Sequence, residues 1–340
     1  MARTRYASDP GLIARMGATM FLLGLVFVGF GVALAFLILY GPHLFSSAHQ
    51  SGYGYNGGAA VNTGGASVSG ASIIILAAVI GIGSALASYW WSDKIALATS
   101  RARLVGPNDS RDAARLHAVV DRICAMADMP KPRVAIAPTT MPNAFATGRN
   151  SNKAVVCATQ GILDKLDDNE ELEGVLAHEL SHVAHKDVAV MTIASFLGII
   201  AALMVRFAFY SELFGGRGRN NNNNAALLII PIMVLSIVVY AVSFLLIRML
   251  SRYRELAADR SGALLTARPD KLASALVKVT GDMARIPQRD LRQAEPLNTF
   301  YFTPALRPGD NHLGAIFSTH PSLQKRLAQL EKIQRQLGQG

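Results

Sequence analysis

Charged residues are scarce in this chain of 340 residues. Asp, Glu, Lys and Arg make up 16% of the sequence, whereas 51% of it is hydrophobic. Because ordinary soluble domains carry about 25% charged residues, this composition excludes a typical soluble protein and predicts a membrane protein.

Cysteines are also few, and the positive charge lacks the pattern of a nucleic-acid-binding protein. The sequence has two cysteines, Cys124 and Cys157; their spacing does not fit a zinc site, and we expect reduced thiols on the cytoplasmic side. The net charge of +10 is not arranged as a basic stripe with interleaved aromatic residues, so no nucleic-acid partner is expected. Much of this charge lies beside apolar segments, where it sets topology and meets anionic headgroups.

Four long apolar runs account for the low charge. They are Met20–Tyr40, Ala71–Trp91, Val188–Tyr210 and Ala226–Ile247. Each holds 21 to 23 residues, and a helix needs about 20 to cross a bilayer. Buried helices of a soluble core are the alternative, above all for the last two runs, which Arg206 and Pro231 interrupt. The first run is too long for a signal peptide and lacks a clean cleavage site, so we interpret it as a retained anchor.

The distribution of Lys and Arg predicts the orientation. Basic residues precede the first run and follow the second and fourth runs, whereas residues 41–70 contain no charged residue. Cytoplasmic segments carry the excess of Lys and Arg. We therefore expect a multi-pass protein of the cell membrane with both termini and residues 92–187 in the cytoplasm, although Arg217 and Arg219 argue mildly against this.

The predicted order of segments follows from these runs. It is a cytoplasmic N-terminus (1–19), transmembrane helix 1 (20–40), an external loop rich in Gly, Ser and Asn (41–70), transmembrane helix 2 (71–91), the first part of a cytoplasmic domain (92–187), transmembrane helix 3 (188–210), a hairpin loop (211–225), transmembrane helix 4 (226–247) and the second part of the cytoplasmic domain (248–340).

Periodicity predicts several elements of the cytoplasmic domain. These are a helix over 112–126, short strands at 133–137 and 154–158 joined by a polar loop, an acidic-start helix capped by Asp167 or Asp168, and a last helix with an apolar stripe from Leu323 to Leu337. We expect that last helix to dock on the domain.

The acidic-start helix carries the sequence His178-Glu179-Leu180-Ser181-His182, an HExxH motif. Residues four apart share one face of a helix, so both imidazoles can bind one metal ion. That arrangement is typical of zinc, with Glu179 placed to take a proton from the water on the metal.

A catalytic zinc needs a third protein ligand. His185 is near, but it lies about 10 Å along the axis from His178, and we interpret it as a neighbouring or interfacial residue. Glu255 is the better candidate, and Asp259, one turn further, can accept a hydrogen bond from a ligating imidazole. If the third and fourth runs form an antiparallel hairpin, it brings the helices of His182 and Glu255 together at the membrane surface.

Five stretches resemble one known family. They are PNAFATGR (142–149), VVCATQGIL (155–163), VLAHELSHV (175–183), RELAADRSGA (254–263) and FSTHPSLQKRL (317–327). In these stretches the chain resembles the HtpX-type membrane zinc metalloproteases, gluzincins related to the CaaX prenyl proteases.

The resemblance implies a mainly α (α+β) fold, with a multi-helix transmembrane region and a cytoplasmic zincin-like protease domain that carries a small β-sheet. It implies hydrolysis of damaged or misfolded membrane proteins in quality control at the cytoplasmic membrane face, with one Zn²⁺ per chain. His178, His182 and Glu255 would bind the zinc, Glu179 would be the catalytic acid and base, and Asp259 would orient a ligand.

Two roles within the resemblance stay open. His320 either hydrogen-bonds the oxyanion, or Thr319 or His320 caps a helix with Pro321 in its first turn. The backbone of Asn143–Gly148, which includes Ala144 and Phe145, or that of Ala154–Ala158 either pairs with the substrate or belongs to an ordinary internal hairpin.

The sequence leaves two alternative functions. An intramembrane site-2-type protease would bury HExxH in the bilayer, where the charges on both sides of the motif would be costly. A membrane scaffold or chaperone-like adaptor with a structural metal would have no use for Glu179. The sequence does not indicate the oligomeric state.

Overall fold

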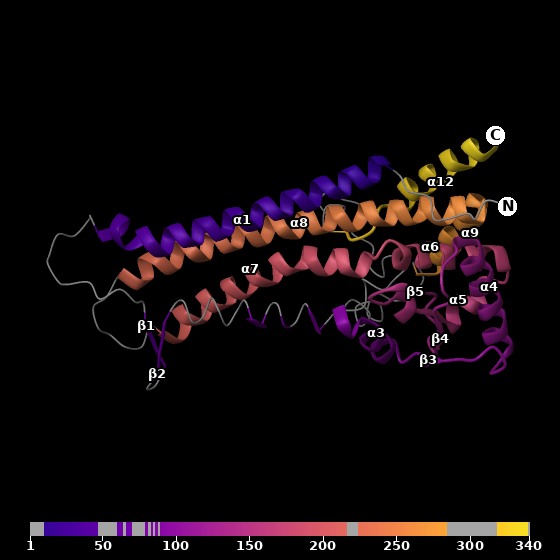
Figure 1. Cartoon of the computed structure of the whole chain (residues 1–340), viewed down its shortest axis with the longest axis horizontal. Helices are drawn as coiled ribbons and strands as arrows, with labels where there is room; N and C mark the ends of the chain where they lie inside the picture. Colours follow the sequence, from indigo (N-terminus) through magenta and orange to yellow (C-terminus); the bar gives the residue numbers. More distant parts are fainter. Residues whose placement is uncertain are drawn as a thin grey trace. The chain divides into compact units, whose positions relative to one another are not determined.

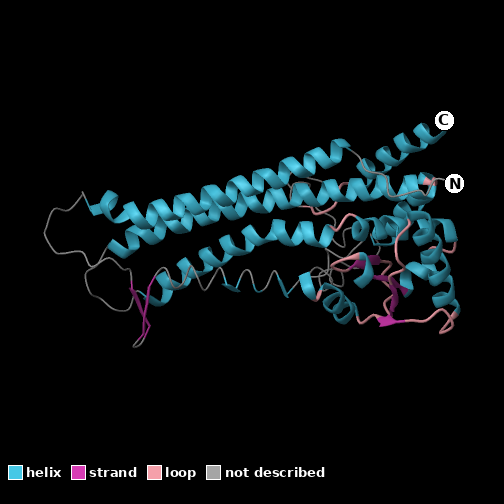
Figure 2. Cartoon of the chain, in the orientation of Figure 1, coloured by secondary structure: helices cyan, strands magenta, loops and turns pink. Residues whose placement is uncertain are grey.

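The structure, a computed structural model, describes residues 10–46, 60–63, 66–69, 79–80, 83, 86–87, 89–215, 224–283 and 318–338 (Figure 1). Helices dominate these residues and the strands are short (Figure 2). The chain divides into two compact units. One contains Met1–Ala18, Ala87–Met191 and Arg248–Gly340, and the other contains Thr19–Leu86 and Thr192–Ile247.

Long apolar helices α1 (Pro10–Ser46), α7 (Asp187–Gly215) and α8 (Asn224–Thr266) contain three of the four predicted runs. Among the described residues, α1 and α8 are each long and apolar enough to cross a membrane, whereas α7 meets that test only when joined to the helix before it. The chain is therefore a membrane protein with a mainly helical fold. The number of spans stays a prediction.

These helices run beyond the predicted runs. α1 begins at Pro10, since the fixed φ of proline suits the first helical position. α8 continues through Pro231, whose missing N–H removes a single hydrogen bond near the start of a 43-residue helix. Glu255 therefore lies in the same helix as the fourth run.

Part of the predicted topology lies outside the described residues. That part includes residues 1–9, most of the second run, residues 216–223 of the hairpin loop and residues 284–317. The predicted loop 41–70 contains two strands, β1 (Ala60–Thr63) and β2 (Ala66–Ser69). They pair antiparallel, with Val61 opposite Val68.

The other unit carries a mixed four-stranded sheet. Its strands are β3 (Arg103–Leu104), β4 (Arg133–Ala137), β5 (Ala144–Thr147) and β6 (Val155–Thr159), in the order β3-β4-β6-β5. β4 and β6 are parallel, whereas the outer pairs are antiparallel. In this described sheet β5 is an edge strand and β6 is central, so Ala154–Ala158 cannot supply a free edge.

Helices surround this sheet. They are α3 (Ser92–Ser100), α4 (Arg111–Ala127), the 3₁₀ turn η1 (Ser151–Lys153), α5 (Gln160–Lys165), α6 (Asn169–Ala184), α9 (Pro269–Met283) and α12 (Leu323–Gly338). The predicted helices at 112–126 and 167–182 correspond to α4 and α6. Asp168, one of the two predicted caps, accepts a hydrogen bond from Glu170 N.

Side chains alternate between the two faces of the sheet, as the period of a strand requires. Val156 and Ala158 of β6 join the main core, which also contains buried residues of α4, α5, α6, α8, α9 and α12. Val155 and Cys157 belong to a second cluster with Phe145 and Ala96 of α3. Leu330 and Ile333 of α12 are buried in the main core, so the last helix docks as predicted.

Glycine allows two helices to approach the backbone of α6 closely. A Cβ atom at Gly262 of α8 would lie 2.9 Å from the backbone nitrogen of His178. A Cβ atom at Gly174 of α6 would lie 3.2 Å from Cα of Leu272 in α9. α6 is therefore held at fixed distances from α8 and α9, and α6 and α8 carry the candidate metal ligands.

Candidate metal centre

Helix α6 presents the two histidines of the HExxH motif from one face. The rings of His178 and His182 lie 5.0 Å apart between centroids and are perpendicular. The side chain of His178 is buried, and that of His182 is 12% exposed. Spacing along the helix thus puts both imidazoles beside one point, as expected from the sequence.

Glu255 of α8 completes a group of three possible ligands. One ligand atom from each of His178, His182 and Glu255 lies within 4.8 Å of the other two. His178 Nε2 is 3.6 Å from Glu255 Oε2, and His182 Nε2 is 3.5 Å from Glu255 Oε1.

These separations test whether the residues suit a zinc ion. Zinc–nitrogen and zinc–oxygen bonds of 2.0–2.2 Å place two ligands of a tetrahedron about 3.3 Å apart. The two measured separations exceed this value by only a few tenths of an ångström. Two imidazoles and one carboxylate also form a donor set typical of catalytic zinc, so the residues fit the metal.

Each histidine is oriented through its other ring nitrogen. His178 Nδ1 lies 2.9 Å from Asp259 Oδ1, and His182 Nδ1 lies 2.6 Å from Asp187 Oδ2. Carboxylates in these positions fix the ring orientation and make the facing nitrogen more basic. Both imidazoles therefore turn Nε2 toward Glu255.

Two arginines, the buried Arg326 and the partly exposed Arg254, hold these two carboxylates. Arg326 donates to both oxygens of Asp259, at 2.8 and 2.6 Å, and Arg254 Nε lies 2.9 Å from Asp187 Oδ2. Burial favours the neutral acids, but Arg326 and His178 hold the pKa of Asp259 below its usual value, and Arg254 and His182 do the same for Asp187. Both carboxylates are therefore acceptors.

Glu179 lies between the metal ligands and the sheet. Its Oε2 accepts a hydrogen bond of 3.3 Å from the backbone N–H of Ala146, in the edge strand β5. Burial raises the pKa of Glu179, although the two histidines oppose the shift. A carboxyl group with a raised pKa beside a metal site is suited to accepting and returning a proton.

His320 also faces this group. Its Nδ1 lies 3.0 Å from Glu255 Oε2, and the side chain is buried. α12 begins at Leu323, and Ser322 Oγ accepts from Lys325 N. The expectation that Thr319 or His320 caps this helix, with Pro321 in its first turn, is therefore wrong.

Comparisons with known proteins identify the family of this chain. The model of peptidase family M48 matches residues 110–334. This chain belongs to peptidase family M48. The resemblance predicted from the sequence is confirmed, and the M48 chain is a membrane metallopeptidase, a hydrolase acting on peptide bonds.

Individual relatives cover almost the whole M48 chain. It is 54% identical over 337 residues to "Protease HtpX homolog 1" of Streptomyces coelicolor, covering 99% of this chain and 97% of the relative. It is 45% identical over 337 residues to "Protease HtpX homolog" of Moorella thermoacetica, covering 98% of each. The crystal structure of S. mikatae Ste24p matches 91% of this chain and 66% of that chain, with 16% identity and a TM-score of 0.46, and is too distant to support a conclusion.

In the structure, His185 does not belong to the metal-ligand group. His185 ends α6, where its backbone N–H bonds to Ser181 O. The only possible metal-ligand group found among the described residues is His178, His182 and Glu255.

The candidate substrate-binding residues lie along β5. Ala144 belongs to the main core and Phe145 to the second cluster. Asn143 is buried, and its N–H donates to Thr159 Oγ1 at 2.9 Å. Any contact of this segment with a substrate would therefore be made by its backbone.

Asp187 and Arg326 of the M48 chain were assigned no role in the site from the sequence. Asp187 follows Lys186, whose φ of 57° separates α6 from α7, and helical periodicity does not extend across such a break. Arg326 comes from α12, more than sixty residues along the chain from Asp259. In the sequence, Arg326 lies three residues after Leu323 and four before Leu330, so it shares the face of the apolar stripe. That position was the signal that could have identified it.

Proposed function

We propose that this chain is a zinc-dependent endopeptidase that cleaves misfolded membrane proteins at the cytoplasmic face of the cell membrane. The observation that carries the proposal is the convergence of three possible zinc ligands beside the buried carboxyl group of Glu179. Membership of peptidase family M48 supports the reaction class.

In this proposal His178, His182 and Glu255 hold one zinc ion, and Asp259 and Asp187 orient the two imidazoles. A bound zinc ion supplies a water molecule of lowered pKa and polarises the scissile carbonyl group. Arg326 and Arg254 favour the ionised form of these two carboxylates, which maintains the ligand geometry.

Glu179 acts as general base and then as general acid. Its carboxylate accepts the proton of the attacking water, and the resulting acid returns that proton to the leaving amine. Burial and the raised pKa support this role because they lower the cost of the protonated state. His320 Nδ1 lies 3.0 Å from Glu255 Oε2 and donates to that carboxylate. With both ring nitrogens protonated, Nε2 would in addition donate to the negative charge that develops on the carbonyl oxygen.

The substrate backbone would pair with β5, an edge strand of the described sheet. Ala146 N–H donates to Glu179 at this edge, so a peptide strand added there would lie next to the catalytic base. This arrangement needs an extended backbone and no particular side chain, which suits unfolded segments.

A location at the membrane surface is supported by charge. Arg252 and Arg254 of α8 follow the apolar part of that helix, and the basic residues before the first run and after the second run obey the positive-inside rule. A cysteine placed at the exposed Lys332 of α12 should resist a membrane-impermeant maleimide in intact cells and react after permeabilisation. Labelling in intact cells would contradict the cytoplasmic orientation.

The decisive experiment compares Glu179→Gln with the wild type on an unfolded membrane-protein substrate in detergent. Loss of a general base should reduce turnover by about 10²–10⁴-fold, while zinc content measured by mass spectrometry stays at one per chain. Glu170→Gln is the matched control, because Glu170 lies on the same helix and pairs at the surface with Arg268. A chelator should abolish wild-type activity. Equal turnover in the Glu179→Gln variant, or in chelated protein, would contradict the proposal.

His320 requires a separate test. His320→Ala should reduce turnover without loss of zinc, because His320 is proposed to act on the reacting carbonyl and not as a metal ligand. Unchanged turnover would exclude this role.

A further inference from the structure

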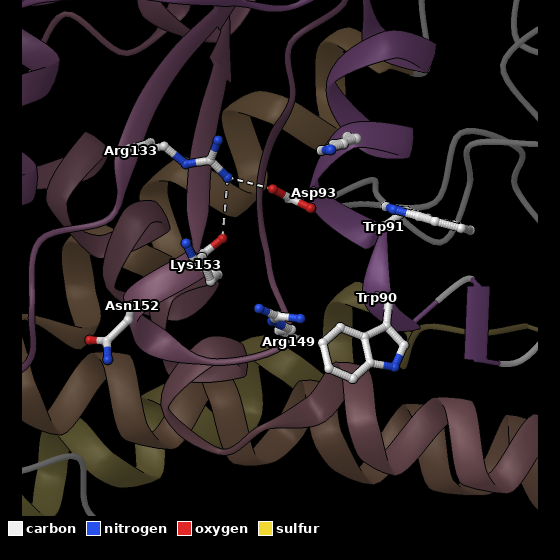
Figure 3. A pocket seen from close by; sticks show the side chains of 8 residues that line it. Trp90, Trp91, Asp93, Arg133, Arg149, Asn152 and Lys153 are labelled. Carbon is white, nitrogen blue, oxygen red and sulfur yellow. Dashed lines mark hydrogen bonds and ion pairs between the residues drawn. The ribbon is translucent and has the colours of Figure 1, made fainter.

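A polar cavity lies where the second apolar run ends, and none of the residues that line it belongs to the metal centre. Its volume is about 540 Å³, and it is lined by Trp90, Trp91, Asp93, Lys94, Arg133, Arg149, Asn152 and Lys153 (Figure 3). Four basic side chains thus face one carboxylate among the described lining residues. The metallopeptidase reaction uses none of these residues.

The single carboxylate is already engaged. Asp93 pairs with Arg133 at 2.5 Å, and Arg133 also donates to the backbone oxygen of Lys153 at 3.3 Å. Lys94 and Lys153 are exposed and, within the described part of the chain, neither ammonium group forms an ion pair. The cavity therefore has an excess of positive charge that an anion could neutralise.

Local structure directs these charges toward one cavity. The Arg149 guanidinium lies 4.3 Å from the ring centroid of Trp90, and Tyr89 donates to the backbone oxygen of Arg149 at 3.3 Å. Gly148 has a φ of 151°, and a Cβ there would lie 2.6 Å from Ala154 Cα. The loop between β5 and β6 is therefore tightly closed, which sets Arg149 beside Trp90 (Figure 3).

Two half-exposed tryptophans form the rim of the cavity. Trp90 is 55% and Trp91 is 54% exposed, and they are the last residues of the predicted span Ala71–Trp91. Tryptophan is enriched at the level of lipid headgroups, and clusters of Lys and Arg at that level attract anionic lipids. Arginine and lysine are also the side chains that bind phosphate.

We propose that this cavity binds a phosphate group, supplied by the headgroup of an anionic phospholipid. Lys94, Arg149 and Lys153 contact the phosphate, and Trp90 and Trp91 lie against the start of the acyl chains. The choice of a lipid over free phosphate rests on the predicted span that ends at Trp91. The cavity itself requires only the anion.

The chain provides its own probe for this site, because Trp90 and Trp91 are its two tryptophans. Full-length protein would be reconstituted in phosphatidylcholine vesicles that contain 20% of a lipid with brominated acyl chains, which quench nearby tryptophan. Brominated phosphatidylglycerol should be preferred over brominated phosphatidylcholine by about fivefold for each basic side chain that acts on it.

Matched double variants separate this cavity from general charge. Lys94→Gln with Lys153→Gln should remove most of the preference. Lys325→Gln with Lys332→Gln, two exposed positions on α12, should leave it intact. Arg149→Gln should reproduce the loss through a third side chain. Peptide hydrolysis measured on each variant confirms that the protein is folded.

A phosphate titration distinguishes the two sources of the anion. Inorganic phosphate would be compared with chloride at equal ionic strength in lipid-free detergent, with tryptophan emission as the readout. Saturation by phosphate together with equal quenching by the two brominated lipids would keep the site and replace the lipid by free phosphate. The proposal would be overturned if the two brominated lipids quench equally and phosphate has no effect on tryptophan emission. It would also be overturned if the Lys325 and Lys332 control variant loses the preference for phosphatidylglycerol as fully as the Lys94 and Lys153 variant.

Discussion

Substitution of Gly262 by alanine should disturb both the fold and the metal centre. The new Cβ would lie 2.9 Å from the backbone nitrogen of His178 and 3.2 Å from its Cα. Both neighbours are main-chain atoms of α6, which cannot rotate away as a side chain can. An ordinary contact begins near 3.4 Å, so α6 and α8 must separate by about 0.5 Å.

The magnitude follows from this displacement. Overpacking of this kind typically costs about 1–3 kcal/mol of unfolding free energy, which lowers the Tm of a domain of this size by about 2–4 °C per kcal/mol. Metal–ligand distances hold within about 0.2 Å. Because His178 lies on α6 and Glu255 on α8, we expect zinc affinity to fall by about 10–100-fold, the range seen when an orienting partner is lost.

The assay is thermal unfolding in detergent together with zinc retention across a series of chelator concentrations. Gly281→Ala is the matched control, because a Cβ there meets nothing within 4 Å; it should be neutral or stabilising by about 0.5–1 kcal/mol. If the Gly262→Ala variant keeps the wild-type Tm and retains zinc equally well, close helix approach does not set the ligand geometry, and the reasoning fails.

Other side chains give further expectations. Asp187→Asn should weaken zinc binding by about 10–100-fold in chelator competition, because it removes the carboxylate that holds His182; unchanged affinity would exclude this positioning role. Arg326→Met should cost about 3–5 kcal/mol of unfolding free energy, measured by denaturant titration, because it strands a buried carboxylate; a cost below 1 kcal/mol would contradict that account. Burial raises the pKa of Cys124 to about 11 and that of Cys157 to about 12. Both should therefore stay protonated and resist iodoacetamide at pH 8 until the protein unfolds, and rapid modification of folded protein would refute this.

The two histidines of the metal centre could be located from the sequence because their geometry is local. His178 and His182 are four residues apart on a helix whose acidic start and Asp168 cap are visible in the sequence. Glu255 could be predicted from the expected antiparallel pairing of the third and fourth apolar runs and from the family resemblance. The structure places its carboxylate beside the two histidines.

The rest of the site depends on tertiary contacts. Asp187 adjoins the third apolar run, where a charged residue is expected to face the membrane interface, whereas the structure turns its side chain onto His182. Arg326 belongs to an amphipathic helix, where a basic residue is normally exposed, but it is buried against Asp259. The two-residue strand β3 and the edge position of β5 depend on pairing partners that no local pattern specifies.

If substrates pair with β5 as proposed, the edge position of this strand in the described sheet has a consequence for which chains this peptidase can attack. In a folded protein the main-chain donors and acceptors of strands and helices are already satisfied internally, so they are not offered to an outside strand. A protease that recognises its target by pairing with main chain would thus discriminate by folding state without any receptor for damage. Intact membrane proteins would not be cleaved, because their main-chain groups are already hydrogen-bonded and cannot pair with β5.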